Sequence, residues 1–305
     1  MVSQSQHPFS LRSVLYVPGS NQRALAKTAE LSMDAIIIDL EDSIAPGAKD
    51  SARQNTRQFL QDRLPPVGSQ RPLCLTVRVN AQGSPWLEAD LAAMAGLGIH
   101  AVVLPKVDNR EQVEDIARRL GSLESGQKTP PPGLWAMIES PQGVVNAHAI
   151  ATHPRVDALV MGTSDLAKSL LPLVDSGNQP DGRRPALHFA LQQVVLAARA
   201  AGVQVMDGVF TDLSDDVAFV NQCREGAMLG FDGKTVIHPR QIDTANRAFS
   251  PSPEEYERAK IILEGWNNAH AKGEEICVVN GRLVERLHAL QAQRIVTLFE
   301  SLGTR

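Results

Sequence analysis

Cysteine and aromatic residues are scarce in this sequence, and their scarcity excludes two classes of protein. The 305 residues include three cysteines, Cys74, Cys223 and Cys277, which lie far apart and in no metal-binding spacing. This pattern predicts reduced thiols in a cytoplasmic protein and disfavours a disulfide-stabilised secreted domain. The three Trp and two Tyr form no stripe on which nucleic acid bases could stack.

Basic charge and long apolar runs are lacking as well. The formal net charge is -4, with charges of both signs interspersed, so nucleic acid is not expected as the main partner. No apolar run approaches the roughly 18 residues of a membrane helix. The segment Met1–Ser10 lacks the hydrophobic core of a signal peptide. We therefore expect a cytoplasmic enzyme with no membrane partner, and a hydrophobic fraction of 43% is ample for its core.

Short apolar runs alternate with longer amphipathic stretches along most of the chain. The runs are continuous rather than alternating in polarity, which is typical of strands buried on both faces of a parallel sheet. Eight such strands within about 240 residues predict a closed (β/α)8 TIM barrel. An open doubly wound sheet is disfavoured, because Val17–Asn21 after the first strand is not a G-x-G-x-x-G turn. The predicted strands are Ser13–Val17, Ala35–Asp39, Leu73–Val79, Ala101–Leu104, Leu134–Ile138, Ala158–Met161, Val203–Met206 and Ala227–Leu229.

Three loops are rich in Pro, Gly and polar residues. Arg63–Pro72 and Glu124–Gly133 precede strands, so they belong at the bottom face of the barrel. Pro172–Arg184 follows the sixth strand and therefore lies on the top face. Its length and composition suit a lid or a ligand-binding loop.

The pattern changes near residue 250. We expect residues 1–250 to form the catalytic barrel and residues 251–305 to form a C-terminal helical extension. Ser250 or Ser252 would cap its first helix, which runs through about His270. A second helix is predicted from about Leu283 to Leu302.

Charged residues follow the carboxyl ends of nearly all predicted strands, where barrel enzymes build their sites. Glu139 and Asp165 end the fifth and sixth strands, which are neighbours in a barrel. Two carboxylates facing one cavity repel each other, and a hard divalent cation removes that repulsion. Mg²⁺ is therefore predicted here, and Zn²⁺ is disfavoured without His or Cys nearby. The alternative for Asp165 is that it caps a helix beginning at Leu166.

Arg78 lies at the end of the third predicted strand, within an apolar run. A guanidinium in that place needs an anion, and its planar fork suits a substrate carboxylate or a developing oxyanion. The alternative is a buried ion pair with Asp39 or Glu41 on the adjacent second strand. Both can hold together, with the acidic pair orienting the arginine.

Ten short motifs resemble one known family, in order and with similar spacing from about residue 11 to residue 296. They are Tyr16-Val-Pro-Gly, Ile38-Asp-Leu-Glu-Asp-Ser, Val77-Arg-Val-Asn, Leu104-Pro-Lys, Met137-Ile-Glu-Ser, Met161-Gly-Thr-Ser-Asp-Leu, Asp207-Gly-Val-Phe, Gly230-Phe-Asp-Gly-Lys, Ile237-His-Pro-Arg-Gln and Ala245-Asn-Arg-Ala-Phe-Ser-Pro-Ser. The sequence resembles the citrate lyase β-subunit/malyl-CoA lyase family of the HpcH/HpaI aldolase–citrate lyase superfamily, which includes citramalyl-CoA lyase-like proteins. This resemblance implies a barrel of the phosphoenolpyruvate/pyruvate type. It also implies a homotrimer or hexamer in which the extension packs on a neighbouring subunit.

The resemblance further implies a function and the residues that perform it. The implied reaction is Mg²⁺-dependent cleavage or formation of a carbon–carbon bond in a β-hydroxyacyl-CoA thioester such as citryl-, malyl- or citramalyl-CoA, with an oxo-acid as the second product. Mn²⁺ is a possible replacement for Mg²⁺. The alternatives are a thioesterase acting on the same compounds and an aldolase acting on free hydroxy-oxo-acids. By position, Glu139 and Asp165 match the metal ligands, Arg78 contacts the oxo-acid, and Tyr16, Lys27, Ile237 and His238 line the CoA or acyl channel.

The chain departs from the family pattern at two further positions. Asn21 stands where malyl-CoA lyases usually carry an arginine. The family's Gly-x-x-x-Asp segment, whose aspartate reaches a neighbour's site, occurs here as Gly281–Glu285. Glu285 is therefore the candidate acid/base, with one methylene more than aspartate. A further three acidic residues, Asp39, Glu41 and Asp42, are expected to hold Arg78 and the metal's water ligands.

Overall fold

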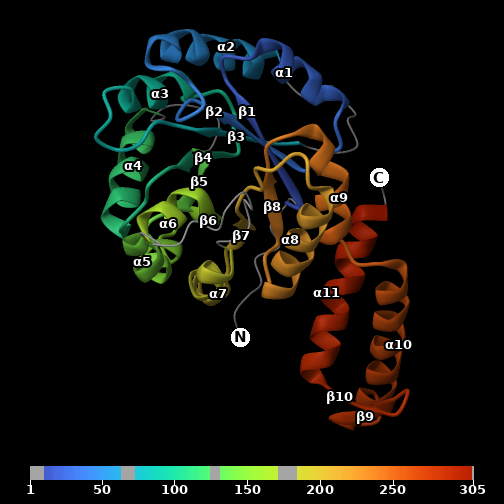
Figure 1. Cartoon of the computed structure of the whole chain (residues 1–305). Coiled ribbons are helices and arrows are strands. Elements are labelled where there is room, and N and C mark those ends of the chain that lie inside the picture. Colours follow the sequence, from blue (N-terminus) through green and yellow to red (C-terminus); the bar gives the residue numbers. More distant parts are fainter. Residues whose placement is uncertain (1–9, 63–72, 124–130, 171–183, 304–305) are drawn as a thin grey trace. The chain divides into compact units, whose positions relative to one another are not determined.

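Eight parallel strands form a closed barrel in the order β1 to β8, with helices on the outside (Figure 1). The computed structural model describes residues 10–62, 73–123, 131–170 and 184–303. The predicted (β/α)8 fold is confirmed, and seven of the eight predicted strands lie where they were expected. The strands are β1 Ser13–Pro18, β2 Ala35–Asp39, β3 Cys74–Arg78, β4 Ala101–Leu104, β5 Gly133–Ile138, β6 Val156–Met161, β7 Gln204–Asp207 and β8 Gly233–Val236.

Burial of both strand faces explains why the apolar runs are continuous. All five residues of β2 are buried, as are all four of β4. One face of the strands fills the barrel interior with side chains such as Ile37, Val103 and Met137, and the other face packs under the surrounding helices. The barrel centre is therefore a packed core, and space for a ligand is left only beyond the strand ends.

The helices that cover the barrel bury one stripe each. In α4 the buried residues Val113, Ile116, Ala117 and Leu120 recur at the spacing of one helix face. The helices are α1 Gln22–Lys27, α2 Lys49–Asp62, α3 Leu87–Met94, α4 Arg110–Leu123, α5 Pro141–Ala151, α6 Thr163–Ser169, α7 Arg184–Ala201, α8 Asp216–Leu229 and α9 Ile242–Ala248, with short 3-10 turns η1 Thr28–Glu30, η2 Pro46–Ala48 and η3 Pro239–Gln241. None of the helices in the described ranges is long and apolar enough to cross a membrane.

The prediction of the eighth strand at Ala227–Leu229 is wrong. Those residues end α8, and Gly230 in the left-handed conformation (φ 99°) closes that helix. The true strand, β8, carries the polar residues Lys234 and Thr235, which are 0% and 1% exposed. Lys234 is neutralised there by Asp207, 3.0 Å away on β7. A buried charge of this kind gives the strand no apolar signature in the sequence.

The chain divides into two compact units, Met1–Asn246 and Arg247–Arg305. The second contains α10 Pro253–His270 and α11 Arg286–Gly303, packed side by side, with a hairpin of β9 Ile276–Val279 and β10 Arg282–Glu285 (Figure 1). Ser252 begins α10 as expected, in a capping box with Glu255.

The hairpin corrects the prediction of a helix beginning at Leu283. Leu283 lies in β10, and α11 begins three residues later at Arg286. The turn between the strands is Asn280-Gly281, with φ angles of 49° and 75°. Both residues therefore adopt positive φ, as a two-residue hairpin turn requires.

The three predicted loops lie wholly or mostly outside the described residues. Arg63–Pro72 lies outside them, with Glu124–Gly133 described only from residue 131 onward. Of Pro172–Arg184, only Arg184 is described, as the first residue of α7.

Candidate functional site

A cavity of about 310 Å³ lies at the carboxyl ends of the barrel strands. Six residues that the sequence singled out line it: Tyr16, Asp39, Arg78, Glu139, Asp165 and Ile237. They come from five strands or the loops that follow them and from the first turn of α6. The parallel barrel thus brings together residues that are up to 221 positions apart in the sequence.

Arg78 holds the centre of an ion-pair network at this cavity. Its Nε and Nη2 donate to the two carboxylate oxygens of Asp39, each at 2.7 Å. Its Nη1 lies 3.0 Å from Oε2 of Glu41, and its guanidinium stands over the ring of Tyr16, 5.1 Å from the centroid. Burial alone would raise the pKa of Asp39, but the hydrogen bonds from Arg78 hold it below its ordinary value. The predicted ion pair of Arg78 is therefore confirmed, and the residue also lines the cavity, whereas its contact with a substrate anion stays a prediction.

Glu41 is enclosed between two cations. Its Oε1 accepts from Nζ of Lys106 at 2.6 Å, while Oε2 faces Arg78 and accepts no hydrogen bond within the described residues. Burial raises the pKa of this carboxyl above its ordinary value, although both cations oppose the shift. Asp42 is exposed and lies 3.6 Å from Nζ of Lys106, outside the cavity lining.

Glu139 follows β5 and is buried, with 4% of its surface exposed. Its Oε1 accepts a hydrogen bond of 2.6 Å from the backbone N–H of Lys106. Its Oε2 lies against Gly162, where a Cβ atom would come within 2.5 Å. Burial raises the pKa of Glu139 to about 7, and the negative charges of Glu41 and Asp165 add to the effect.

Asp165 lies in the first turn of α6, with 40% of its side chain exposed. The helix begins at Thr163 with Gly162 as its N-cap, and no side chain caps it. The alternative that Asp165 merely caps a helix beginning at Leu166 is therefore wrong. Nζ of Lys168 lies 3.5 Å from its carboxylate, one turn along the helix.

Glu139 and Asp165 fit a hard divalent cation. Both present carboxylate oxygens to one cavity, and the charge of Asp165 contributes to the raised pKa of Glu139, as two unneutralised carboxylates require. Within the described ranges no group of three or more His, Cys, Asp or Glu side chains is placed to hold a metal. Mg²⁺ is commonly held by one or two carboxylates, with substrate and water completing its shell.

Two residues predicted to bind the substrate, Lys27 and His238, are not among those that line the cavity. Lys27 is exposed on α1, and His238 caps η3 by accepting the N–H of Arg240. Glu285 belongs to the second unit, where its backbone N–H donates to the ring of His288. Asn21 caps α1 through its side chain.

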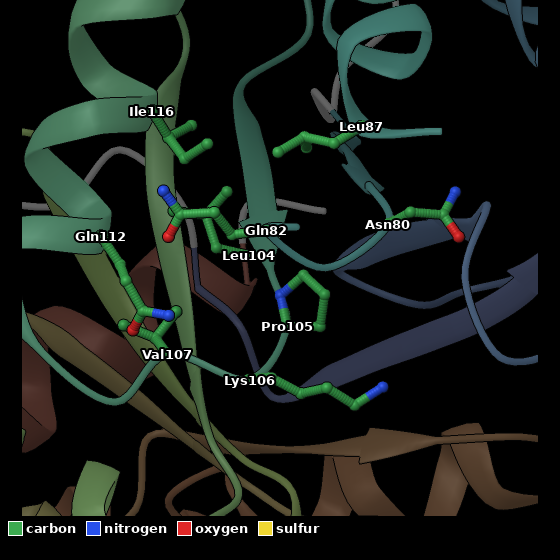
Figure 2. Close-up of a pocket in the computed structure, with 9 residues that line it drawn as sticks. All are labelled: Asn80, Gln82, Leu87, Leu104, Pro105, Lys106, Val107, Gln112 and Ile116. Atoms are coloured by element: carbon green, nitrogen blue, oxygen red, sulfur yellow. The ribbon is translucent and has the colours of Figure 1, made fainter. Parts of the chain in front are cut away.

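Lys106 is a residue whose place the sequence did not disclose. Its Nζ donates to Glu41 and its backbone N–H donates to Glu139, although 48% of its side chain is exposed. Figure 2 shows it in the loop between β4 and α4, with its side chain extending away from Gln112 and Val107. The motif Leu104-Pro-Lys was the available signal. The apolar lining residues Met137, Met161 and Val209 were also missed.

The sequence profile described as HpcH/HpaI aldolase/citrate lyase matches residues 12–239, which is the whole barrel through β8. The chain belongs to this family. The matched range includes the residues at the strand ends that line the cavity, among them Arg78, Glu139 and Asp165.

Relatives within the HpcH/HpaI family carry two kinds of name. The chain is 40% identical over 302 residues to a protein of Cereibacter sphaeroides named (3S)-malyl-CoA thioesterase. The matched region covers 99% of this chain and 98% of that protein. The chain is also 33% identical over 297 residues to the citrate lyase subunit beta of Escherichia coli. That match covers 96% of this chain and 95% of the Escherichia coli protein.

Solved structures similar to this member of the family contain relevant small molecules. CitE from Mycobacterium tuberculosis in complex with magnesium, acetoacetate and coenzyme A has a TM-score of 0.75 at 27% identity, covering 94% of this chain and 97% of that one. The citrate lyase beta subunit of the same organism, complexed with oxaloacetate and magnesium, has a TM-score of 0.65 at 29% identity, covering 79% and 100%.

Replacing Glu139 by Gln should stabilise the metal-free protein at high pH. The folded protein binds the Glu139 proton more tightly than the unfolded chain, so wild-type stability falls as pH rises from about 4.5 to about 7. Glu139→Gln cannot ionise and should be more stable by about 3 kcal/mol near pH 8.5, a difference that vanishes near pH 4.5. Urea unfolding in EDTA measures this difference, with Glu264→Gln on the exposed face of α10 as control. An equal free energy of unfolding at pH 8.5 would contradict the raised pKa.

Proposed function

We propose that the protein is a Mg²⁺-dependent enzyme that cleaves the carbon–carbon bond beside the thioester in a short β-hydroxyacyl-CoA, releasing an oxo-acid. The observation that carries the proposal is the convergence of Arg78, Glu139 and Asp165 on one cavity of about 310 Å³. An anion-binding fork beside two carboxylates suits a metal-held oxo-acid.

In this proposal Arg78 binds the oxo-acid and stabilises negative charge as it develops. Its double hydrogen bond with Asp39 holds the guanidinium plane in place before substrate arrives. Such preorganised donors cost no reorganisation when charge appears on an oxygen. Arg78 Nη1 takes no part in the pairing with Asp39: it lies 3.0 Å from Oε2 of Glu41 and 3.9 Å from the sulfur of Met137, which lines the cavity, and we assign it the contact with the oxo-acid.

Glu139 and Asp165 would hold the metal ion. A Mg²⁺ ion held by these residues would polarise the carbonyl of the oxo-acid and neutralise its carboxylate. Glu139 contributes a carboxylate whose orientation is already restricted on both sides, by Lys106 and by Gly162. Asp165 contributes a partly exposed carboxylate at the entrance, where substrate and water can complete the coordination shell.

The remaining cavity residues suit an acyl thioester. Burial raises the pKa of Tyr16 above its ordinary value, and its hydroxyl donates to the sulfur of Met137 at 3.7 Å. Ile237 is 38% exposed at the rim of the cavity. We assign Tyr16 and Ile237 to the acyl end of the channel, with Lys27 and His238 farther out toward the CoA phosphates.

Hydrolysis of the same thioester is the second candidate function. The specific observation that favours it is the 40% identity, over 99% of this chain, to a protein named (3S)-malyl-CoA thioesterase. Hydrolysis would use the same metal and the same arginine. Water would attack the thioester carbonyl carbon, whereas in the lyase reaction the substrate hydroxyl loses its proton and the carbon–carbon bond breaks.

Product analysis with malyl-, citramalyl- and citryl-CoA tests the function and separates the two candidates. A lyase releases an oxo-acid and a shorter CoA thioester, whereas a thioesterase releases free CoA and the corresponding free hydroxy acid. We expect oxo-acid release that stops in EDTA and returns with Mg²⁺ or Mn²⁺. Free CoA as the sole early product would establish hydrolysis instead. Absence of both products with all three thioesters would refute the proposed substrate class.

Arg78→Lys should lower kcat by about 100-fold or more, because lysine keeps the charge but loses the two-pronged donor. The measurement is steady-state oxo-acid release at saturating metal. Arg53→Lys is the matched control, since Arg53 also pairs with a buried aspartate, Asp90, but lies outside the cavity. Unchanged kinetics in Arg78→Lys would leave the residue only a structural ion-pair role.

We further propose that the protein is a homotrimer or hexamer in which Glu285 serves the site of a neighbouring subunit as acid or base. Cross-strand pairing places Glu285 on the same face of the hairpin as Ile276, Val278 and Leu283. These three apolar residues are 57%, 70% and 53% exposed. An exposed apolar patch around a carboxylate is typical of a surface that docks on another protein.

Mixing inactive variants tests the role of Glu285. Glu139→Gln and Glu285→Gln should each be inactive alone, but their co-expressed mixture should recover about a quarter of wild-type activity, because some sites then combine both intact residues. Activity of Glu285→Gln equal to wild type would remove the residue from catalysis. Two inactive variants that recover nothing when mixed would refute action on a neighbouring subunit.

A further inference from the structure

Lys106 has a backbone conformation that lysine rarely adopts. Its φ angle is 54°, and within the described residues only Asn280 shares a positive φ among non-glycine residues. Side chains with a Cβ are disfavoured in this region, and Gly, Asn and Asp are the usual occupants. Asn280 lies in a hairpin turn that requires the conformation, whereas Lys106 follows Pro105 in the loop between β4 and α4. Contacts on both sides must therefore hold Lys106 in place.

The strained backbone directs two successive N–H groups at the end of β5. The N–H of Lys106 donates to Oε1 of Glu139 at 2.6 Å, and the N–H of Val107 donates to the carbonyl of Met137 at 3.3 Å. The bond from Lys106 occupies one carboxylate oxygen of Glu139. The other oxygen is left on the side of Gly162, which also lines the cavity.

The side chain of the same residue reaches the opposite side of the network. Nζ of Lys106 lies 2.6 Å from Oε1 of Glu41, whose other oxygen faces Arg78 at 3.0 Å. The part of the loop nearer α4 is held separately, because the side-chain oxygen of Gln112 accepts hydrogen bonds from the backbone N–H groups of Asp108 and Asn109. In Figure 2 the Lys106 side chain points away from Gln112. Lys106 does not line the cavity of about 310 Å³.

We propose that Lys106 is a positioning residue that links the anion-binding arginine to the metal site. Its backbone N–H orients Glu139 for the metal, and its ammonium holds Glu41 beside Arg78. Glycine would relieve the backbone but could not reach Glu41, so one residue supplies both contacts at the expense of strain. The inference rests on the proposed function, because it takes Glu139 as a metal ligand.

Two variants that remove the same charge separate the backbone contribution. Lys106→Asn tolerates positive φ, whereas Lys106→Val carries a β-branched side chain that disfavours it. We expect the Mn²⁺ dissociation constant of Lys106→Val to exceed that of Lys106→Asn by about 10-fold or more, as for other residues that orient metal ligands. Electron paramagnetic resonance of free Mn²⁺ measures both constants without substrate.

Gly98→Val is the matched control for backbone strain. Gly98 has a φ of 65° and precedes β4 at the opposite end of the strand from Lys106, with open space around its Cβ position. This variant should lower Tm but bind Mn²⁺ as wild type does. Loss of Mn²⁺ affinity in Gly98→Val equal to that in Lys106→Val would overturn the positioning role, since strain alone would then explain both.

The ammonium contribution is tested by rescue. Lys106→Met should lose turnover at saturating Mn²⁺, and Lys106→Arg should regain most of it, because arginine restores a cation beside Glu41. Equal turnover of Lys106→Met and wild type would overturn this half of the proposal.

Equal Mn²⁺ affinities of Lys106→Asn and Lys106→Val, with wild-type binding intact, would overturn the other half alone. Wild-type protein that binds no Mn²⁺ would instead refute the proposed function and this inference with it.

Discussion

The buried pairing of Arg78 with Asp39 is the contact on which the barrel mouth depends. Two hydrogen bonds of 2.7 Å join them, with Asp39 almost fully buried. Removing one partner of a buried pair usually costs about 3–5 kcal/mol, because the other charge is left uncompensated. From Arg78 the network continues through Glu41 to the ammonium of Lys106, whose backbone N–H donates to Glu139. Each charge in this chain is held by its neighbours, so the cavity receives side chains whose orientation is already determined.

A second buried group of charges shows that a polar strand end is no proof of chemistry. Asp207, at the end of β7, is 0% exposed and lies 3.0 Å from both Lys234 and Arg184. Burial would raise the pKa of Asp207, but these two cations hold it below its ordinary value. Asp207 does not line the cavity of about 310 Å³. Its ion pairs with Lys234 and Arg184 join β7 to β8 and to the start of α7.

The sequence predicted those features that depend on local pattern. Continuous apolar runs such as Ala35–Asp39 were sufficient for the barrel, and its topology then brought Arg78, Glu139 and Asp165 together. β8 could not be found this way, because the partner that makes buried Lys234 acceptable is 27 residues away. The hairpin before α11 was detectable from Asn280-Gly281. The role of Lys106 was not, since it depends on a backbone angle and on two contacts across the barrel mouth.

Because Gly162 has no side chain, the backbone before α6 can approach Glu139 after β5 closely, and a substitution at residue 162 depends on the position of both segments. A Cβ there would lie 2.3 Å from the Cβ of Glu139 as well as 2.5 Å from its Oε2. Because the first of these atoms is fixed to the backbone of the preceding loop, rotation of the carboxylate cannot make room for even a methyl group. Descendants of this chain can therefore enlarge residue 162 only if the backbone after β5 or before α6 shifts first. Substitutions that reshape the cavity without moving this backbone must therefore fall on its other lining residues.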